Sequence, residues 1–109
     1  MLLQILEKFR DDRDWAQFHD SKNLALALSI EAAELNELFL WKKEEEAEQV
    51  DKQRLREELA DVFAYALMLA GRHGLDVSQI VKDKIALNAK KYPVESSRGS
   101  SAKYTKSEE

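Results

Sequence analysis

The chain has 109 residues, a formal net charge of -4 and no cysteine. A single domain of this length has room for only a small core, and the lack of thiols excludes disulfides, thiol catalysis and thiolate metal sites. The acidic balance argues against a general nucleic-acid-binding surface. With only three Gly and one Pro among many Leu, Ala, Glu and Lys, the composition predicts an all-α protein.

The first segment predicts a short amphipathic helix that packs against the rest of the chain. Its apolar residues recur at helical spacing, and it ends in the charged cluster from Asp11 to Asp14. The apolar positions are Leu2, Leu3, Ile5, Leu6 and Phe9. This segment becomes charged too early for a signal peptide, and no apolar run is long enough to cross a bilayer. We therefore expect a cytoplasmic protein without a membrane partner.

A loop from Trp15 to His19 brings two aromatic rings and an imidazole in front of the next helix, for which Asp20 or Ser21 is the expected N-cap. The aromatic rings of Trp15 and Phe18 either plug the end of a helical bundle or contact a ligand, since loops beside functional sites often supply such contacts.

Two predicted helices carry paired carboxylates. In the helix expected from Lys22 to Trp41, residues 31, 34 and 37 are all Glu, and residues 24–41 contain no Lys or Arg. In the helix expected from Gln53 to His73, Glu58 and Asp61 repeat the spacing of three. Residues three apart on a helix have Cβ atoms about 5–6 Å apart, so each pair can converge on one point. The charged segment between them, residues 42–53, is expected to be a solvated connection.

The carboxylate pairs have two interpretations. An acidic stripe is usually solvated, but like charges crowded on a largely apolar surface raise their own pKa values and destabilise the fold unless a cation neutralises them. Carboxylate ligands without His or Cys favour magnesium, with manganese as a substitute. A di-iron bundle would need Glu-x-x-His pairs, and neither His19 nor His73 stands three residues after a Glu. We predict a divalent metal site on these two helices.

Aromatic residues follow both carboxylate pairs. Seven residues return a helix to nearly the same face about 10 Å farther along, which places Trp41 on the face of Glu34 and Tyr65 on that of Glu58.

A fourth helix is predicted between an expected capping box, formed by Asp76 and Gln79, and Tyr92-Pro93. Lys84, Asn88 and Lys91 form a row of phosphate-capable donors on it, although spacing alone favours an ordinary solvated edge. After Pro93 the composition is too polar to fold independently. We expect a folded domain in residues 1–93 and a flexible polar tail in residues 94–109.

These features together resemble a known family. Glu31-Ala-Ala-Glu34 followed by Glu58-Leu-Ala-Asp61 resembles the Glu-x-x-Glu and Glu-x-x-Asp signature of the all-α, MazG-like nucleoside triphosphate pyrophosphohydrolases. Further segments along nearly the whole chain resemble the dCTP pyrophosphatase branch: Phe9-Arg10, Arg13-Asp14-Trp15, Gln17-Phe18-His19, Asn23-Leu24, Glu34-Leu35, Glu37-Leu38-Phe39, Trp41-Lys42, Tyr65, Lys91-Tyr92-Pro93 and Ser100-Ser101-Ala102-Lys103-Tyr104.

The resemblance implies a set of functional residues. The magnesium ligands would be Glu31, Glu34, Glu58 and Asp61. The nucleoside pocket would be formed by Trp15, His19, Trp41 and Tyr65, with Ala16, Gln17 and Phe18 completing its loop. One departure is Leu6, which stands nine residues before Trp15, where some relatives have a His; this puts strict preference for one base in doubt.

The implied reaction is hydrolysis of a nucleoside triphosphate between its α- and β-phosphates, yielding a monophosphate and pyrophosphate in a housecleaning role. Glu34 or Glu37 is the candidate general base toward the attacking water. The candidate triphosphate partners are Lys84, Asn88, Lys91, Lys103 and Tyr104.

The expected fold is a four-helix MazG-like bundle completed by homo-oligomerisation. The helix of residues 53–73 has an apolar surface too broad for one small monomer to cover, so a homodimer is the minimum, and the resemblance implies a homotetramer. Other interpretations remain: a dUTP hydrolase, a phosphoribosyl-ATP pyrophosphohydrolase, or a non-catalytic helical interaction module. The paired tryptophans and the tail favour the dCTP branch.

Overall fold

The structure is a computed structural model that describes residues 1–102 and contains helices but no strand in that range, which confirms the all-α class. The chain forms two units, residues 1–74 and residues 75–109. The first unit contains α1 (Leu2–Asp12), a 3-10 turn (Ala16–Phe18), α2 (Ser21–Glu37), α3 (Glu44–Ala47) and α4 (Lys52–Arg72). The second contains α5 (Val77–Lys91) and α6 (Val94–Ser97).

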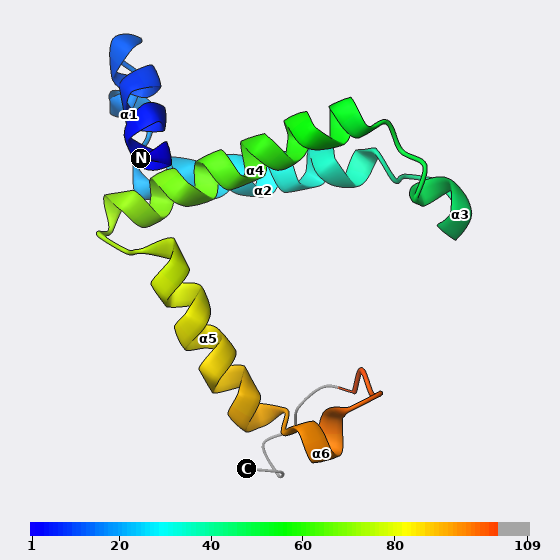
Figure 1. The fold of residues 1–109 in the computed structure, drawn as a ribbon. Coiled ribbons are helices and arrows are strands. Elements are labelled where there is room, and N and C mark those ends of the chain that lie inside the picture. Colours follow the sequence, from blue (N-terminus) through cyan, green and yellow to red (C-terminus); the bar gives the residue numbers. More distant parts are fainter. Residues whose placement is uncertain (103–109) are drawn as a thin grey trace. The chain divides into compact units, whose positions relative to one another are not determined.

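In the first unit, α2 and α4 lie side by side along their length, and α1 packs against the C-terminal part of α4 (Figure 1). The contact between α1 and α4 is close at Gly71. A Cβ atom at that position would lie 2.6 Å from Cδ2 of Leu3, so the absence of a side chain allows the two helices to approach. This approach sets the position of α1, which carries one wall of the cavity described below.

Aspartate side chains begin three of the helices. Asp20 Oδ1 accepts a hydrogen bond from the backbone N–H of Asn23 at 2.8 Å, and Asp51 caps α4 in the same way. The predicted capping box at α5 is only half correct. Asp76 accepts from the N–H of Gln79 at 2.8 Å, but the Gln79 side chain donates forward to Asp83 at 2.8 Å instead of returning to the cap.

The helix that carries residues 31, 34 and 37 is shorter than predicted, because α2 ends at Glu37 rather than at Trp41. The next turns are tightened by bonds to the third residue back, such as Phe39 N–H to Asn36 O at 3.0 Å. Trp41 itself has φ 64, a left-handed conformation that cannot continue a helix. Its side chain is 92% exposed, so the prediction that it shares the helical face of Glu34 is wrong.

Two further elements differ from the sequence-based expectation. A single helical turn, α3, lies within the predicted solvated connection, and α6 forms another turn at the start of the predicted tail. Both have four residues. Acidic residues at the N-terminus of α3 favour the first turn through the helix dipole.

The core of the described residues is small. Leu24, Leu38 and Ala70 are its buried apolar side chains, while Ile30 and Phe63 remain 58% and 62% exposed. None of the helices in residues 1–102 is both long and apolar enough to span a bilayer.

Candidate functional site

Three of the predicted metal ligands come together between α2 and α4. One carboxylate oxygen from each of Glu31, Glu34 and Glu58 can be chosen so that all lie within 4.8 Å of one another. The Oε2 atoms of Glu31 and Glu58 are buried and have no hydrogen-bond partner within residues 1–102. Buried acceptors without a donor are costly, and a hard cation is one way to satisfy them. This carboxylate cluster therefore fits a divalent ion that prefers oxygen ligands.

The electrostatics of the carboxylate cluster reflect this crowding. The pKa of Glu31 is raised from 4.5 to about 7, first by burial and then by a hydrogen bond with Glu34 and the negative charges around it. Burial also raises the pKa of Glu58, with further contributions from the charges of Glu34 and Asp61. Without a cation, protonation of Glu31 relieves this repulsion near neutral pH. Metal binding would release that proton.

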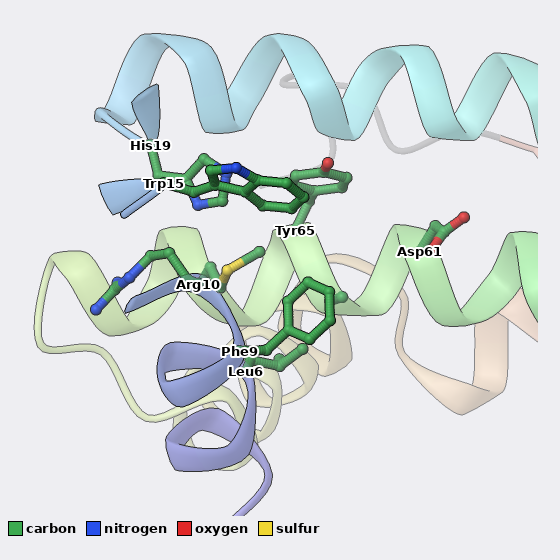
Figure 2. A pocket seen from close by; sticks show the side chains of 9 residues that line it. Leu6, Phe9, Arg10, Trp15, His19, Asp61 and Tyr65 are labelled. Carbon is green, nitrogen blue, oxygen red and sulfur yellow. The ribbon is translucent and has the colours of Figure 1, made fainter. Parts of the chain in front are cut away.

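A cavity of about 250 Å³ opens beside the carboxylate cluster. Its lining comes from three places: Leu6, Phe9 and Arg10 on α1, Trp15 and His19 around the 3-10 turn, and Asp61, Ala64, Tyr65 and Met68 on α4 (Figure 2). Asp61 lies at one end of this group and Arg10 at the other, with the aromatic rings between them. Asp61 is not in the 4.8 Å cluster, but its charge acts on Glu31 and its side chain lines the cavity. It joins the two parts of the site.

The rings of the cavity are arranged edge to face. The His19 and Tyr65 centroids are 6.3 Å apart with an interplanar angle of 71°, and those of Phe9 and Trp15 are 5.8 Å apart at 73°. Burial, followed by the positive charge of Arg10, lowers the pKa of His19, so the imidazole is neutral at pH 7. Burial and the nearby carboxylates raise the pKa of the Tyr65 phenol. The cavity thus offers aromatic surfaces and two uncharged polar groups.

The loop before α2 is held by its own side chains. The Gln17 amide donates to the Asp14 backbone carbonyl at 2.9 Å and to its carboxylate at 3.1 Å. The Arg13 guanidinium lies 3.7 Å from the centre of the Phe9 ring and donates to the Phe9 carbonyl at 2.9 Å. Ala16, Gln17 and Phe18 are exposed and do not line the cavity. Gln17 and Arg13 position the loop, and direct substrate contacts by residues 16–18 stay a prediction.

Leu6, Phe9 and Arg10 line the cavity but were not predicted as site residues, although their spacing indicates that they share one helical face. Leu6, Phe9 and Arg10 stand at i, i+3 and i+4, which is one face of α1. The cavity residues on α4 also share one helical face, because Ala64, Tyr65 and Met68 stand three, four and seven residues after Asp61. The pattern was assigned to packing because apolar stripes of this kind usually serve the core.

The remaining predicted residues lie elsewhere. The cavity adjoins His19, just before α2, whereas Trp41 lies beyond the other end of that helix, which is roughly 25 Å long. Glu37 is the exposed last residue of α2 and is outside the carboxylate cluster. Lys84, Asn88 and Lys91 lie on α5 in the second unit, and Lys103 and Tyr104 lie outside the described residues. Their roles stay predictions.

Comparison with known proteins identifies the family. The model of the MazG-like family matches residues 26–106, a range that contains both carboxylate pairs. The chain belongs to the MazG-like family. The MazG-like chain is 45% identical over 103 residues to dCTP pyrophosphatase 1 of Bos taurus and of Mus musculus, and 42% identical to that of Homo sapiens. These matches cover 90% of this chain and 61% of the relatives, so the chain spans about three fifths of their length.

A solved structure supports the same assignment. The crystal structure of a pyrophosphatase from Archaeoglobus fulgidus is similar to this MazG-like chain with a TM-score of 0.80 and 43% sequence identity. The similarity covers 84% of this chain and 89% of the archaeal one. The resemblance inferred from the sequence motifs is therefore confirmed at the level of family and fold.

Proposed function

We propose that this MazG-like chain is a magnesium-dependent nucleoside triphosphate pyrophosphohydrolase. It hydrolyses deoxynucleoside triphosphates, with dCTP favoured, to the monophosphate and pyrophosphate, and removes surplus or damaged nucleotides from the cytoplasmic pool. The observation that carries the proposal is the carboxylate cluster of Glu31, Glu34 and Glu58 beside an aromatic cavity that shares Asp61 with it. The names of the curated relatives support the choice of dCTP.

The donor atoms of the carboxylate cluster suit magnesium, with manganese able to replace it. All are carboxylate oxygens, and two of them are buried without partners in the described part of the chain. Glu31, Glu34, Glu58 and Asp61 would hold the ion. Magnesium bound there would supply neutralisation of the phosphate oxygens and activation of the attacking water.

The chain's own residues hold the rest of the substrate. Trp15 and Tyr65 offer ring surfaces to a nucleobase, and His19 adds a polar group at an edge-to-face distance from Tyr65. The triphosphate lies toward Asp61, where Glu34 or Glu37 serves as the general base. The candidate donors for its outer oxygens stay those predicted from the sequence, Lys84, Asn88, Lys91, Lys103 and Tyr104, whose side chains can donate to phosphate.

Association of at least two copies, and of four as the family resemblance implies, completes the protein. Leu26 and Ile30 form an exposed stripe on α2, and Phe63 is exposed on α4. Apolar surfaces of this extent are typical of interfaces. Trp41 reaches a nucleoside pocket only in such an assembly, because its own chain's cavity lies at the other end of α2. We propose that a second copy supplies this indole.

The reaction is tested with dCTP, dTTP, dUTP and dATP, each with magnesium and with excess chelator. The expected products are monophosphate and pyrophosphate, formed only with the metal. Diphosphate and inorganic phosphate would indicate cleavage at the other bond. No turnover of any nucleotide, together with an unchanged melting temperature on adding magnesium, would favour the non-catalytic interaction module.

Co-expression of two variants tests the shared pocket. Glu34→Gln lacks a proposed metal ligand and Trp41→Ala lacks the indole, and loss of one stacking contact should weaken substrate use by roughly tenfold or more. A mixed dimer contains one pocket with both groups intact if Trp41 acts across the interface. Turnover of the mixture should then exceed the sum of the separate variants. Turnover no higher than that sum would show that Trp41 does not act in a partner's pocket.

A further inference from the structure

Arg10 is the cationic residue of the cavity lining, and its position at the end opposite Asp61 suggests a role that the proposed reaction does not assign. Residues 6, 9 and 10 share one face of α1 by their spacing, and Figure 2 shows the Arg10 side chain extending away from the Phe9 ring. If the carboxylate cluster holds the phosphates at the Asp61 end, the base lies toward Arg10. Much of the remaining lining is apolar, as Leu6, Phe9 and Met68 show, and His19 is the other polar side chain near Arg10.

The Arg10 guanidinium is held by one hydrogen bond, and its other N–H groups can still donate to a ligand. Arg10 Nε donates to Asp11 Oδ1 at 2.8 Å, and the arginine side chain is only 23% exposed. No second hydrogen bond of this side chain occurs within residues 1–102, so the N–H groups on its two Nη atoms remain available. Asp11 fixes the inner nitrogen while the outer fork can meet a ligand.

A second polar group stands at the same end of the cavity. His19 Nδ1 is buried and has no hydrogen-bond partner in the described chain. Burial, followed by the positive charge of Arg10, lowers the pKa of this imidazole, which favours its uncharged form beside the guanidinium. The unpartnered buried nitrogen of His19 and the Nη groups of Arg10 lie at one end of an aromatic cavity, and such polar groups indicate where a polar ligand edge is read.

We propose, building on the proposed function, that Arg10 determines the choice of base by donating from its Nη groups to the adjacent acceptors N3 and O2 of cytosine. A guanidinium fork suits two neighbouring acceptors. In uracil and thymine N3 carries a hydrogen, so the fork would meet a donor and leave buried groups unpaired, which is an effective means of rejection. Arg10 therefore separates dCTP from dUTP and dTTP, while the aromatic rings bind all three.

The test compares Arg10→Met with Lys8→Met. Both remove one cation and one aspartate contact from α1, but Lys8 pairs with Asp12 on the exposed surface and does not line the cavity. The ratio of kcat/KM for dCTP to that for dUTP should fall by roughly tenfold in Arg10→Met, the size of one bidentate contact, and stay at the parent value in Lys8→Met. Arg10→Lys keeps the charge but loses the fork, so it should resemble Arg10→Met. If Arg10→Lys keeps the parent's ratio of kcat/KM for dCTP to that for dUTP, the effect comes from charge alone, and the proposed two-point contact of the guanidinium is wrong.

A binding measurement separates this inference from the proposed reaction. Calorimetry with dCMP and dUMP reports the affinity ratio without turnover, and circular dichroism confirms that the variants are folded. Loss of the dCMP preference in Arg10→Met supports the role of Arg10 even if the parent hydrolyses no triphosphate. An equal ratio in parent and variant, or no dCMP preference in the parent, overturns it even if the parent is an active pyrophosphohydrolase.

Discussion

Replacing Glu31 by Gln should stabilise the metal-free protein and weaken its response to magnesium. Glu31 is an acid whose pKa rises from 4.5 to about 7 on folding, chiefly through burial and the neighbouring Glu34. The folded state therefore binds more protons than the unfolded state between these values, and stability falls as the pH rises through this window. Above pH 7 the full penalty is present, and Glu31→Gln removes it.

The magnitude follows from the two pKa values. Their difference corresponds to an upper bound of about 3.4 kcal/mol of free energy of unfolding. Because the carboxylate cluster is partly open to water, screening should leave about 1 kcal/mol. For a chain of this size that is a rise in melting temperature of about 5 °C. Glu31→Gln should thus melt about 5 °C above the parent at pH 8 with chelator, and the difference should vanish toward pH 4.5.

Adding magnesium should reverse the order of the two proteins. An ion present at a hundred times its dissociation constant stabilises the parent by about 2.7 kcal/mol, and the variant, lacking one charge of the carboxylate cluster, gains less. Thermal melts at pH 8 and pH 5, with magnesium and with chelator, give all the comparisons. The control is Glu57→Gln, which removes an exposed negative charge on α4 outside the carboxylate cluster. Its melting temperature should match that of the parent with and without magnesium. A Glu31→Gln variant that melts below the parent without metal, or keeps the whole magnesium response, would refute the reasoning.

Three other predictions concern the same unit and the tail. Glu34→Gln and Asp61→Asn should each abolish turnover while circular dichroism shows an intact helical fold, and turnover within tenfold of the parent in both would contradict the metal assignment. Deleting residues 96–109 should raise KM more than it lowers the melting temperature, because the segment offers phosphate donors but little core; unchanged kinetics would make it an idle terminus. Gly71→Ala should destabilise by about 1–3 kcal/mol through its clash with Leu3, but stabilise by up to about 1 kcal/mol in a Leu3→Ala background, where only helix propensity acts. Additive effects in that double-mutant cycle would exclude the contact.

The sequence predicted what depends on local rules. The four long helices, the Asp20 and Asp76 caps and the convergence of Glu31, Glu34 and Glu58 all follow from helical periodicity and short-range hydrogen bonding. These predictions need no knowledge of how the chain folds back on itself beyond the pairing of two carboxylate helices. The family followed from the same spacing, since its signature is carried by those helices.

The predictions of the end of α2 and of the cavity lining failed because they depend on a left-handed backbone conformation and on tertiary contacts. The end of α2 was misplaced because no Gly or Pro marks it. The helix ends at Glu37, and the left-handed residue after the turns that follow is Trp41, a side chain that rarely adopts this conformation. Asp61 was assigned to the metal site alone, although its position on α4 also makes it part of the cavity. Arg10 could not be recognised because its neighbours in the cavity come from three segments far apart in the sequence.

The carboxylate cluster and the cavity use different sets of elements, which under the proposed function would separate the chemistry from the choice of base. The carboxylate cluster is formed by α2 and α4, which pack along their whole length (Figure 1). The wall of the cavity that carries Leu6, Phe9 and Arg10 belongs to α1, which is positioned on α4 by the close approach of Leu3 to Gly71. If this proposal holds, substitutions of Leu6, Phe9 or Arg10 on α1 should alter which base is accepted without moving a proposed metal ligand. A change of specificity in this protein should accordingly map to α1 and the 3-10 turn, and a loss of metal dependence to α2 and α4.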